Sequence, residues 1–145
     1  MRVMFYQISR DPAHALVPLL ARKSLEAGER VLVVSADKDQ TAAISRALWS
    51  AAPDSFLANG EAGDAHAERQ PVLLSDEPEA RNGARFMILA DGQWREGDFE
   101  RTFYLFDEAT ISQAREVWRS LRERQGLEME YWAQENGRWS RKATN

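Results

Sequence analysis

Three short runs of apolar residues constrain the fold of this chain more than any other feature of its sequence. They cover residues 30–35, 86–90 and 102–106, and their interiors do not alternate with polar residues. A strand with one wet face alternates apolar and polar side chains, whereas a strand covered on both faces is continuously apolar. Strands covered on both faces are typical of parallel sheets flanked by helices, so the runs predict an α/β fold.

Helical patterns separate the first strands. After a strand over residues 3–8, Asp11 and Pro12 are expected to begin a helix as its cap and first residue, and Gly28 to end it in a left-handed conformation. Apolar residues of that helix recur at the spacing of one face: Leu16, Leu19, Leu20 and Ala27. A second helix is expected over residues 37–49. This β-α-β-α order predicts right-handed crossovers and a parallel core.

The rest of the chain is less regular. Residues 53–69 have no clear period and are interpreted as a partly irregular connection. The elements expected after it are a strand over 71–75, an acidic loop over 76–84, a helix over 110–125 ended by Gly126, a strand over 127–134 and a hairpin turn at Asn136-Gly137. Together these patterns predict one domain over residues 1–145, with a mostly parallel central sheet flanked by helices and a mononucleotide-binding-like (Rossmann-like) topology.

Composition excludes several classes of protein. The chain has no cysteine, so disulfides and thiolate metal sites are excluded. The apolar N-terminal stretch is too short for a signal peptide, and no apolar run approaches the length of a membrane span, which favours a cytoplasmic protein without membrane contact. The net charge of −4 removes any overall attraction to nucleic acid, although a local basic patch stays possible.

Motifs for catalysis are missing. The sequence contains neither a G-x-G-x-x-G nor a G-x-x-x-x-G-K-[ST] phosphate loop. The segment over residues 103–108 ends in Asp107 and Glu108, as in the magnesium-binding strand of ATPases, but without a phosphate loop these acids are better explained as helix-capping residues. His14 and His66 are isolated from other metal-ligand motifs. We therefore predict no catalytic residues, no metal site, no cofactor and no enzymatic activity of the chain by itself.

The helix expected over residues 110–125 carries a row of arginines. Arg115, Arg119 and Arg122 fall at i, i+4 and i+7 and share one face, with Trp118 beside them. Such a row beside an exposed aromatic ring would suit an anionic ligand with one apolar anchor. The same pattern also fits a solvated charged face over a core tryptophan, and the pattern alone favours this second interpretation.

A second aromatic group follows the helix expected over residues 37–49. Trp49 ends that helix, and Pro53 and Phe56 follow in the irregular connection. Large aromatic side chains on a loop are candidate anchors for a protein partner, because tryptophan and tyrosine dominate interface hot spots. They could equally cover the edge of the core.

The chain resembles the chi subunit family of bacterial DNA polymerase III. The resemblance follows the order of the chain over nearly its whole length and depends on the combination of segments, not on any single motif. Its segments are Phe5-Tyr6, Arg30-Val31-Leu32-Val33, Ala47-Leu48-Trp49 with Pro53 and Ser55-Phe56, Gln70-Pro71-Val72-Leu73-Leu74, Arg115-Glu116-Val117-Trp118-Arg119 and Arg124-Gln125-Gly126.

This resemblance implies a non-catalytic accessory subunit associated with the clamp loader in DNA replication. It would bind the psi subunit and the acidic C-terminal tail of single-stranded DNA-binding protein, which ends in a phenylalanine carboxylate, and would contact DNA only indirectly. The tail site would comprise Arg115, Trp118, Arg119 and Arg122, and the surface for psi or a helicase would comprise Trp49, Pro53 and Phe56.

The chain departs from the family pattern in three places. A lysine that assists the tail site in the family is replaced near Ile111 or Gln113, a histidine that follows the Phe56 segment is Asn59, and the stretch from Leu127 is more aromatic and hairpin-like. Alternative functions are direct binding of single-stranded DNA, a role as a helicase partner in DNA repair, and a degenerate nucleotide-binding enzyme.

Overall fold

The computed structural model describes residues 1–9, 11–50 and 57–145. Within these residues, three α-helices and one short 3-10 helix accompany a single eight-stranded sheet. The elements in chain order are β1 (Arg2–Gln7), α1 (Ala13–Glu26), β2 (Val31–Val34), α2 (Lys38–Trp49), β3 (Asn59–Glu61), η1 (Ala67–Arg69), β4 (Val72–Ser75), β5 (Phe86–Leu89), β6 (Arg101–Phe106), α3 (Ile111–Leu121), β7 (Glu128–Glu135) and β8 (Arg138–Thr144).

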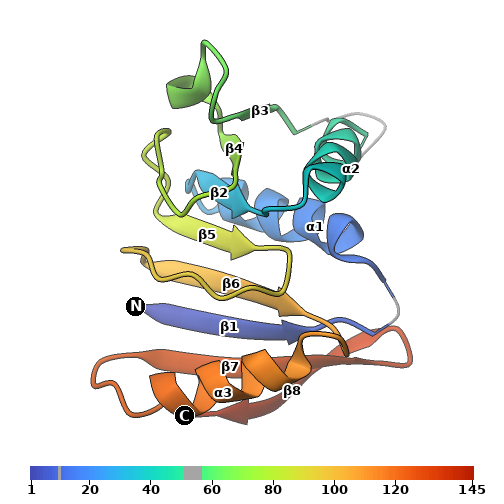
Figure 1. Ribbon diagram of the computed structural model, residues 1–145, viewed down its shortest axis with the longest axis vertical. Helices are drawn as coiled ribbons and strands as arrows, with labels where there is room; N and C mark the ends of the chain where they lie inside the picture. Colours follow the sequence, from blue (N-terminus) through green and yellow to red (C-terminus); the bar gives the residue numbers. More distant parts are fainter. Residues whose placement is uncertain (10, 51–56) are drawn as a thin grey trace.

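The sheet has the strand order β3-β4-β2-β5-β6-β1-β7-β8. Every neighbouring pair from β3 to β7 is parallel, and β8 pairs antiparallel with β7 at the edge. In Figure 1 the strands follow one another from β3 at the top to β8 at the bottom. The predicted α/β class with a mostly parallel sheet is therefore confirmed.

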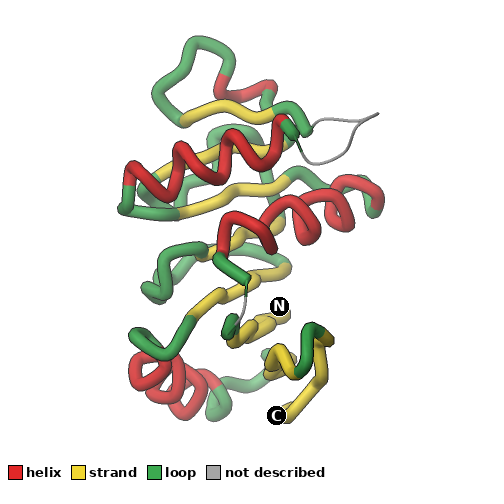
Figure 2. The backbone as a smooth tube through the Cα atoms, turned by 90° about the vertical axis from the view of Figure 1, so that its right-hand side faces the viewer, coloured by secondary structure: helices red, strands yellow, loops and turns green. Residues whose placement is uncertain are grey.

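Apolar side chains on the two faces of the sheet form two separate cores. In β2, Val31 and Val33 belong to the core that includes residues of α1 and α2. Leu32 and Val34 belong to the core of the other face, which α3 shares with residues between the strands such as Ala67, Ala84 and Phe99. Successive side chains of a strand point to opposite faces, which is why strands covered on both sides carry no polar alternation. The helices also occupy different ends of the sheet, with α1 and α2 over its β2 half and α3 beside β7 and β8 (Figures 1 and 2).

The first two helices begin differently. The Asp37 carboxylate caps α2 by accepting hydrogen bonds from the backbone N–H groups of Asp39 and Gln40 at 2.9 and 3.2 Å. The prediction that Asp11 caps α1 is wrong, because Pro12 occupies the cap position without a side-chain hydrogen bond. The Asp11 carboxylate instead accepts a hydrogen bond of 2.8 Å from the Gln134 side chain, on β7.

The predicted end of α1 at Gly28 is confirmed, but the predicted apolar face of this helix is wrong at Leu19. Gly28 has a φ of +84°, the left-handed conformation expected after the helix. Leu19 shares the helical spacing of the buried leucines, yet 54% of its surface is exposed.

None of the helices that the structure describes has the length and apolar character of a membrane span.

Two further expectations need correction. The helix expected over residues 110–125 ends at Leu121, because the polar residues 122–125 follow the last buried side chain and have no core contact to keep them helical. Gly126, with a φ of +77°, leads from the turn into β7. The connection over residues 53–69 also contains β3, which pairs in parallel with the outer edge of β4 despite its lack of an apolar pattern.

The predicted hairpin turn is confirmed, and it joins β7 to β8. Asn136 and Gly137 have φ values of +51° and +77°, which is the two-residue turn that matches the twist of paired strands. The register of the hairpin shifts between Tyr131 and Trp132, where Tyr131 pairs with Ala143 and Trp132 pairs with Arg141. The shift leaves Lys142 as an extra residue in a β-bulge.

Candidate functional site

The arginine row lies on the solvent side of α3. The apolar side of this helix packs on the sheet through buried Ala114 and Leu121 and through partly buried Ile111, Val117 and Trp118. Because Arg115 and Arg119 are exposed along the edge of this apolar side, next to Trp118, α3 is an amphipathic helix that the core holds in one orientation.

The four predicted tail-site residues meet at one cavity of about 410 Å³. Arg115, Trp118 and Arg119 come from α3, and Arg122 comes from its C-cap. The opposite side of the cavity is formed by the C-terminal hairpin, through Tyr131 of β7 and Lys142 and Ala143 of β8. We call this cavity, with its seven lining residues, the basic cavity.

Trp118 has both roles between which the sequence could not decide. Its indole packs edge-on against Phe5, with ring centroids 5.1 Å apart, and against Tyr131 at 5.8 Å. These contacts place it partly in the core, and it also lines the basic cavity. The cavity therefore has an aromatic wall whose position is fixed by packing.

The charged residues that line the basic cavity are all positive. Among the described residues, the observed ion pairs include none with Arg115, Arg119 or Arg122, whereas the Lys142 ammonium contacts the Glu135 carboxylate. Such a cluster attracts anions, and guanidinium groups bind carboxylates in a bidentate manner.

The Tyr131 hydroxyl is bound within the protein, which fixes the Tyr131 ring in the wall of the basic cavity. Its hydroxyl lies 2.6 Å from the Gln7 side-chain oxygen, to which it donates a hydrogen bond. Burial raises the pKa of this hydroxyl, and the positive charge of nearby Arg115 offsets part of that rise. The ring therefore stays neutral at physiological pH and can serve as an apolar contact surface.

Sequence reasoning missed the hairpin side of the basic cavity. Lys142 reaches the cavity from the bulged position of β8, and bulges re-aim side chains without leaving a clear sequence signal. The only available signals were its basic character and its place after a predicted turn. A lysine from the hairpin thus lines the same cavity as the arginines of α3.

The second predicted surface is only partly described. Trp49 lies at the end of α2 with 48% of its surface exposed, whereas Pro53 and Phe56 lie outside the described residues. Asn59, which follows these residues in the chain, is buried. Its side chain accepts a hydrogen bond of 2.7 Å from Ser45 and donates one of 2.9 Å to the Leu57 carbonyl. The side chain of Asn59 thus anchors β3 to α2.

The crevice at the carboxyl ends of β1, β5 and β6 is where open α/β sheets commonly bind ligands. Its acidic lining residues in the described part of the chain are Asp11, Asp91 and Asp107. Three carboxylates would repel phosphate groups. Within the same part of the chain, no group of three or more histidine or acidic residues could hold a metal ion.

Asp91 is a structural residue of that crevice. Arg95 holds its carboxylate in a bidentate ion pair at 2.8 Å, and the backbone N–H of Ala36 donates to it at 2.9 Å. Burial raises the pKa of Asp91, but the hydrogen bonds from Arg95 and from the backbone outweigh it, so the net pKa is lowered. The hydrogen bond from Ala36 joins the ends of β2 and β5, and the ion pair with Arg95 binds the Asp91 carboxylate within the protein.

Comparison with known proteins assigns the family. None of the curated proteins compared matches the chain. A family model described as "DNA polymerase III chi subunit, HolC" matches residues 1–130 of the 145 residues, which includes α3 and the start of β7 but not Lys142. Because the match covers well over half of the sequence, the chain belongs to the chi subunit family of DNA polymerase III.

Proposed function

We propose that this accessory subunit of the replicative polymerase is an adaptor that binds the acidic C-terminal tail of single-stranded DNA-binding protein in the basic cavity. The observation that carries the proposal is the meeting of Arg115, Arg119, Arg122 and Lys142 around a wall made by Trp118 and Tyr131. A tail of this kind combines aspartates, a terminal carboxylate and a phenylalanine ring. The cavity offers a complementary group for each of them.

The energetics of this complex divide between charge and apolar contact. An exposed ion pair contributes only about 0.2–1 kcal/mol, so several pairs are needed to hold the carboxylates. Burial of one phenylalanine ring against Trp118 and Tyr131 contributes about 1.5–3 kcal/mol. Micromolar affinity corresponds to about −8 kcal/mol, which suits a contact that must form and dissociate during replication.

Lys142 is proposed to take the place of the family lysine that is replaced near Ile111 or Gln113. It lines the same cavity from β8, on the side opposite to α3. Its contact with Glu135 holds the ammonium group near the cavity but also weakens its pull on a ligand. An incoming carboxylate would have to compete with Glu135 for this lysine.

Trp49, together with Pro53 and Phe56, is proposed as the surface for the psi subunit or a helicase. The supporting observation is the exposure of nearly half of the Trp49 surface at the end of α2. Replacement of both Trp49 and Phe56 by alanine should abolish binding of the psi partner but leave tail binding intact. A double variant that unfolds would identify these residues as core residues.

Fluorescence anisotropy tests the tail site. A labelled peptide that is rich in aspartate and ends in Pro-Phe with a free carboxylate should bind saturably at low salt and more weakly at high salt. Amidation of the terminal carboxylate should remove most of the binding. Arg115→Glu should abolish measurable binding without a change in melting temperature, whereas Arg138→Glu, an equal charge change on an exposed residue outside the cavity, should have little effect.

Two results would contradict the adaptor proposal. Equal affinity of the wild type and Arg115→Glu would place the peptide elsewhere. Absence of binding at low salt would mean that the protein does not recognise such a tail. A labelled single-stranded oligonucleotide serves as the comparison, since tight binding of it that Arg115→Glu abolishes would favour direct DNA binding over the adaptor role.

A further inference from the structure

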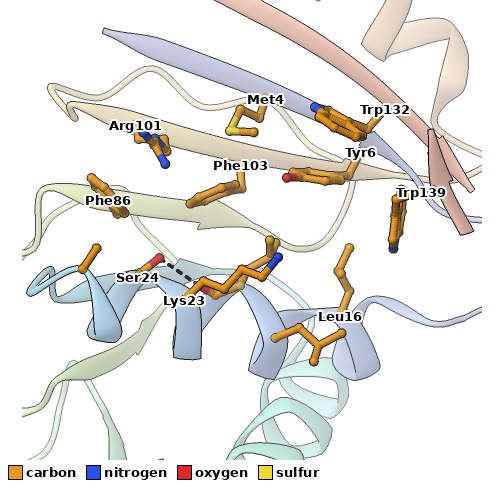
Figure 3. Close-up of a pocket in the computed structure, with 13 residues that line it drawn as sticks. Met4, Tyr6, Leu16, Lys23, Ser24, Phe86, Arg101, Phe103, Trp132 and Trp139 are labelled. Carbon is orange, nitrogen blue, oxygen red and sulfur yellow. Dashed lines mark hydrogen bonds between the residues drawn. The ribbon is translucent and has the colours of Figure 1, made fainter. Parts of the chain in front are cut away.

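A second cavity lies on the opposite face of the sheet from α3. It has a volume of about 470 Å³ and separates α1 from the strands at the centre and edge of the sheet. Figure 3 shows Leu16, Lys23 and Ser24 of α1 facing Phe103, Tyr6 and Trp139 across the open space. We call it the aromatic cavity; it belongs to the core of α1 and α2, whereas the basic cavity belongs to the core of α3.

Aromatic rings with fixed positions form the sheet side of the aromatic cavity. Tyr6 stacks on Trp132 with ring centroids 6.4 Å apart, and Trp139 contacts Tyr6 edge-on at 5.3 Å. Burial raises the pKa of Tyr6 to about 12, so its ring stays neutral. These rings contact one another and form a continuous apolar surface along one side of the cavity.

The apolar surface continues out of the cavity onto α1. Leu19 lines the cavity, and 54% of its surface is exposed to solvent. A cavity for a small metabolite usually places several polar groups around its ligand, whereas here an exposed leucine extends the rim. An apolar side chain carried on a larger molecule fits this shape, because that molecule would also cover Leu19.

The charged side chains that line the aromatic cavity are both positive. They are Lys23 on α1 and Arg101 at the start of β6, and among the described residues neither belongs to an observed ion pair. The Arg101 guanidinium lies over the Phe86 ring, 5.0 Å from its centroid. Figure 3 places Arg101 and Phe86 at one end of the cavity and Trp139 at the other.

The indole of Trp132 contributes its ring, and not its N–H group, to the aromatic cavity. Its Nε1–H is buried and has no acceptor within the part of the chain that the structure describes. Because this N–H is closed off from solvent, a bound segment would contact the indole ring, which stacks on Tyr6.

We propose that the aromatic cavity docks a segment of a partner protein that carries a large apolar side chain flanked by acidic residues. The apolar side chain enters between α1 and the rings of Tyr6 and Trp139, and the acidic residues face Lys23 and Arg101. This site goes beyond the tail-binding function, because it occupies the other face of the sheet. One subunit could therefore hold two partners at once.

Charge disfavours the other possible occupants. A nucleic acid strand needs a row of cations along its backbone, and this cavity offers two in a chain whose net charge is −4. A second copy of the chain, seated here about a two-fold axis, would bring the positive rims of both copies together. An acidic protein segment is the occupant for which both the apolar wall and the charges are favourable.

A peptide-display selection on the full-length protein tests the proposal, with a random peptide library as the probe. The selected peptides should share an aromatic residue or leucine flanked by aspartate or glutamate. Synthetic versions should bind at least about tenfold more weakly to Leu19→Asp and to Lys23→Glu, a loss of about 1.4 kcal/mol. Both changes are at exposed positions of α1, so the fold should persist.

Matched controls separate this site from the basic cavity. Lys38→Glu, the same charge change on α2 outside the aromatic cavity, and Arg115→Glu should both leave the affinity of the selected peptides unchanged. The proposal would be overturned by a selection without enrichment, by selected peptides without acidic residues, or by equal affinity for Leu19→Asp. Oligonucleotide binding or self-association that Leu19→Asp abolishes would also overturn it, since either would identify a different occupant.

Discussion

Replacement of Trp118 by alanine would separate the two roles of this residue in one experiment. The indole is half-buried and contacts the rings of Phe5 and Tyr131 at centroid distances of 5.1 and 5.8 Å. Removal of a fully buried tryptophan costs about 3–5 kcal/mol, and each edge-on aromatic contact contributes about 0.5–1.5 kcal/mol of its own. Since Trp118 is only half-buried, we expect a smaller loss than for a fully buried tryptophan, about 2–3 kcal/mol.

This loss should be visible as a change in melting temperature. For a chain of 145 residues, 1 kcal/mol corresponds to roughly 3 °C, so Trp118→Ala should melt about 6–9 °C below the wild type. Arg115→Glu changes an exposed residue of the same helix and should alter the free energy of unfolding by no more than about 0.5 kcal/mol. Both variants should lose the acidic peptide, but for different reasons.

Calorimetry and urea unfolding, followed by peptide anisotropy well below the melting temperature, distinguish these reasons. Trp118→Phe keeps an edge-on ring against Phe5 and should recover much of the stability while it still binds the peptide weakly. An unchanged melting temperature in Trp118→Ala would refute the packing role of the indole. An equal drop in Arg115→Glu would refute the conclusion that the arginine row is solvent-exposed.

Three other predictions follow from individual contacts. Lys142→Gln should weaken peptide binding by up to about fivefold, the upper limit for an exposed ion pair, as measured by anisotropy; no change would exclude it from the site. Asp91→Asn should destabilise the fold at neutral pH by roughly 2 kcal/mol, less than for a fully buried pair, because it leaves the partly buried Arg95 guanidinium unpaired. Since the pKa of Asp91 is lowered in the folded state, its ionised carboxylate stabilises the fold above about pH 4, and this contribution is lost as the pH falls. In urea titrations at acid pH, the free energies of unfolding of wild type and variant should therefore converge. The pKa values of Tyr6 and Tyr104 are raised by burial to about 12, so ultraviolet titration should show little tyrosinate near pH 10 while the protein is folded. Deprotonation in the unfolded chain should then reduce stability as the pH rises above about 10.

The parallel sheet could be predicted from the sequence because its strands are covered on both faces. Burial on two sides forces a continuous apolar run, as in β2 and β5, and such runs stand out from the polar loops around them. The cap at Asp37 and the turn at Asn136-Gly137 were also predictable, since each depends on a local hydrogen bond or backbone conformation.

Features that depend on distant partners could not be predicted. Strand β3 has a glycine at its centre and forms because β4 offers a free edge for pairing. The end of α3 at Leu121 depends on where its core contacts stop. For the candidate site, the α3 side followed from helical spacing, whereas the hairpin side required the register of β7 and β8. A bulge that moves Lys142 into the basic cavity cannot be located without that register.

The C-terminal hairpin connects the basic cavity and the aromatic cavity. Lys142 and Ala143 line the basic cavity, while Trp132 and Trp139 line the aromatic cavity on the other face. A paired strand can serve both faces because its successive side chains alternate between them. The family match covers residues 1–130, so most of the hairpin lies outside the matched part. Substitutions in this one hairpin can therefore change the lining of both cavities.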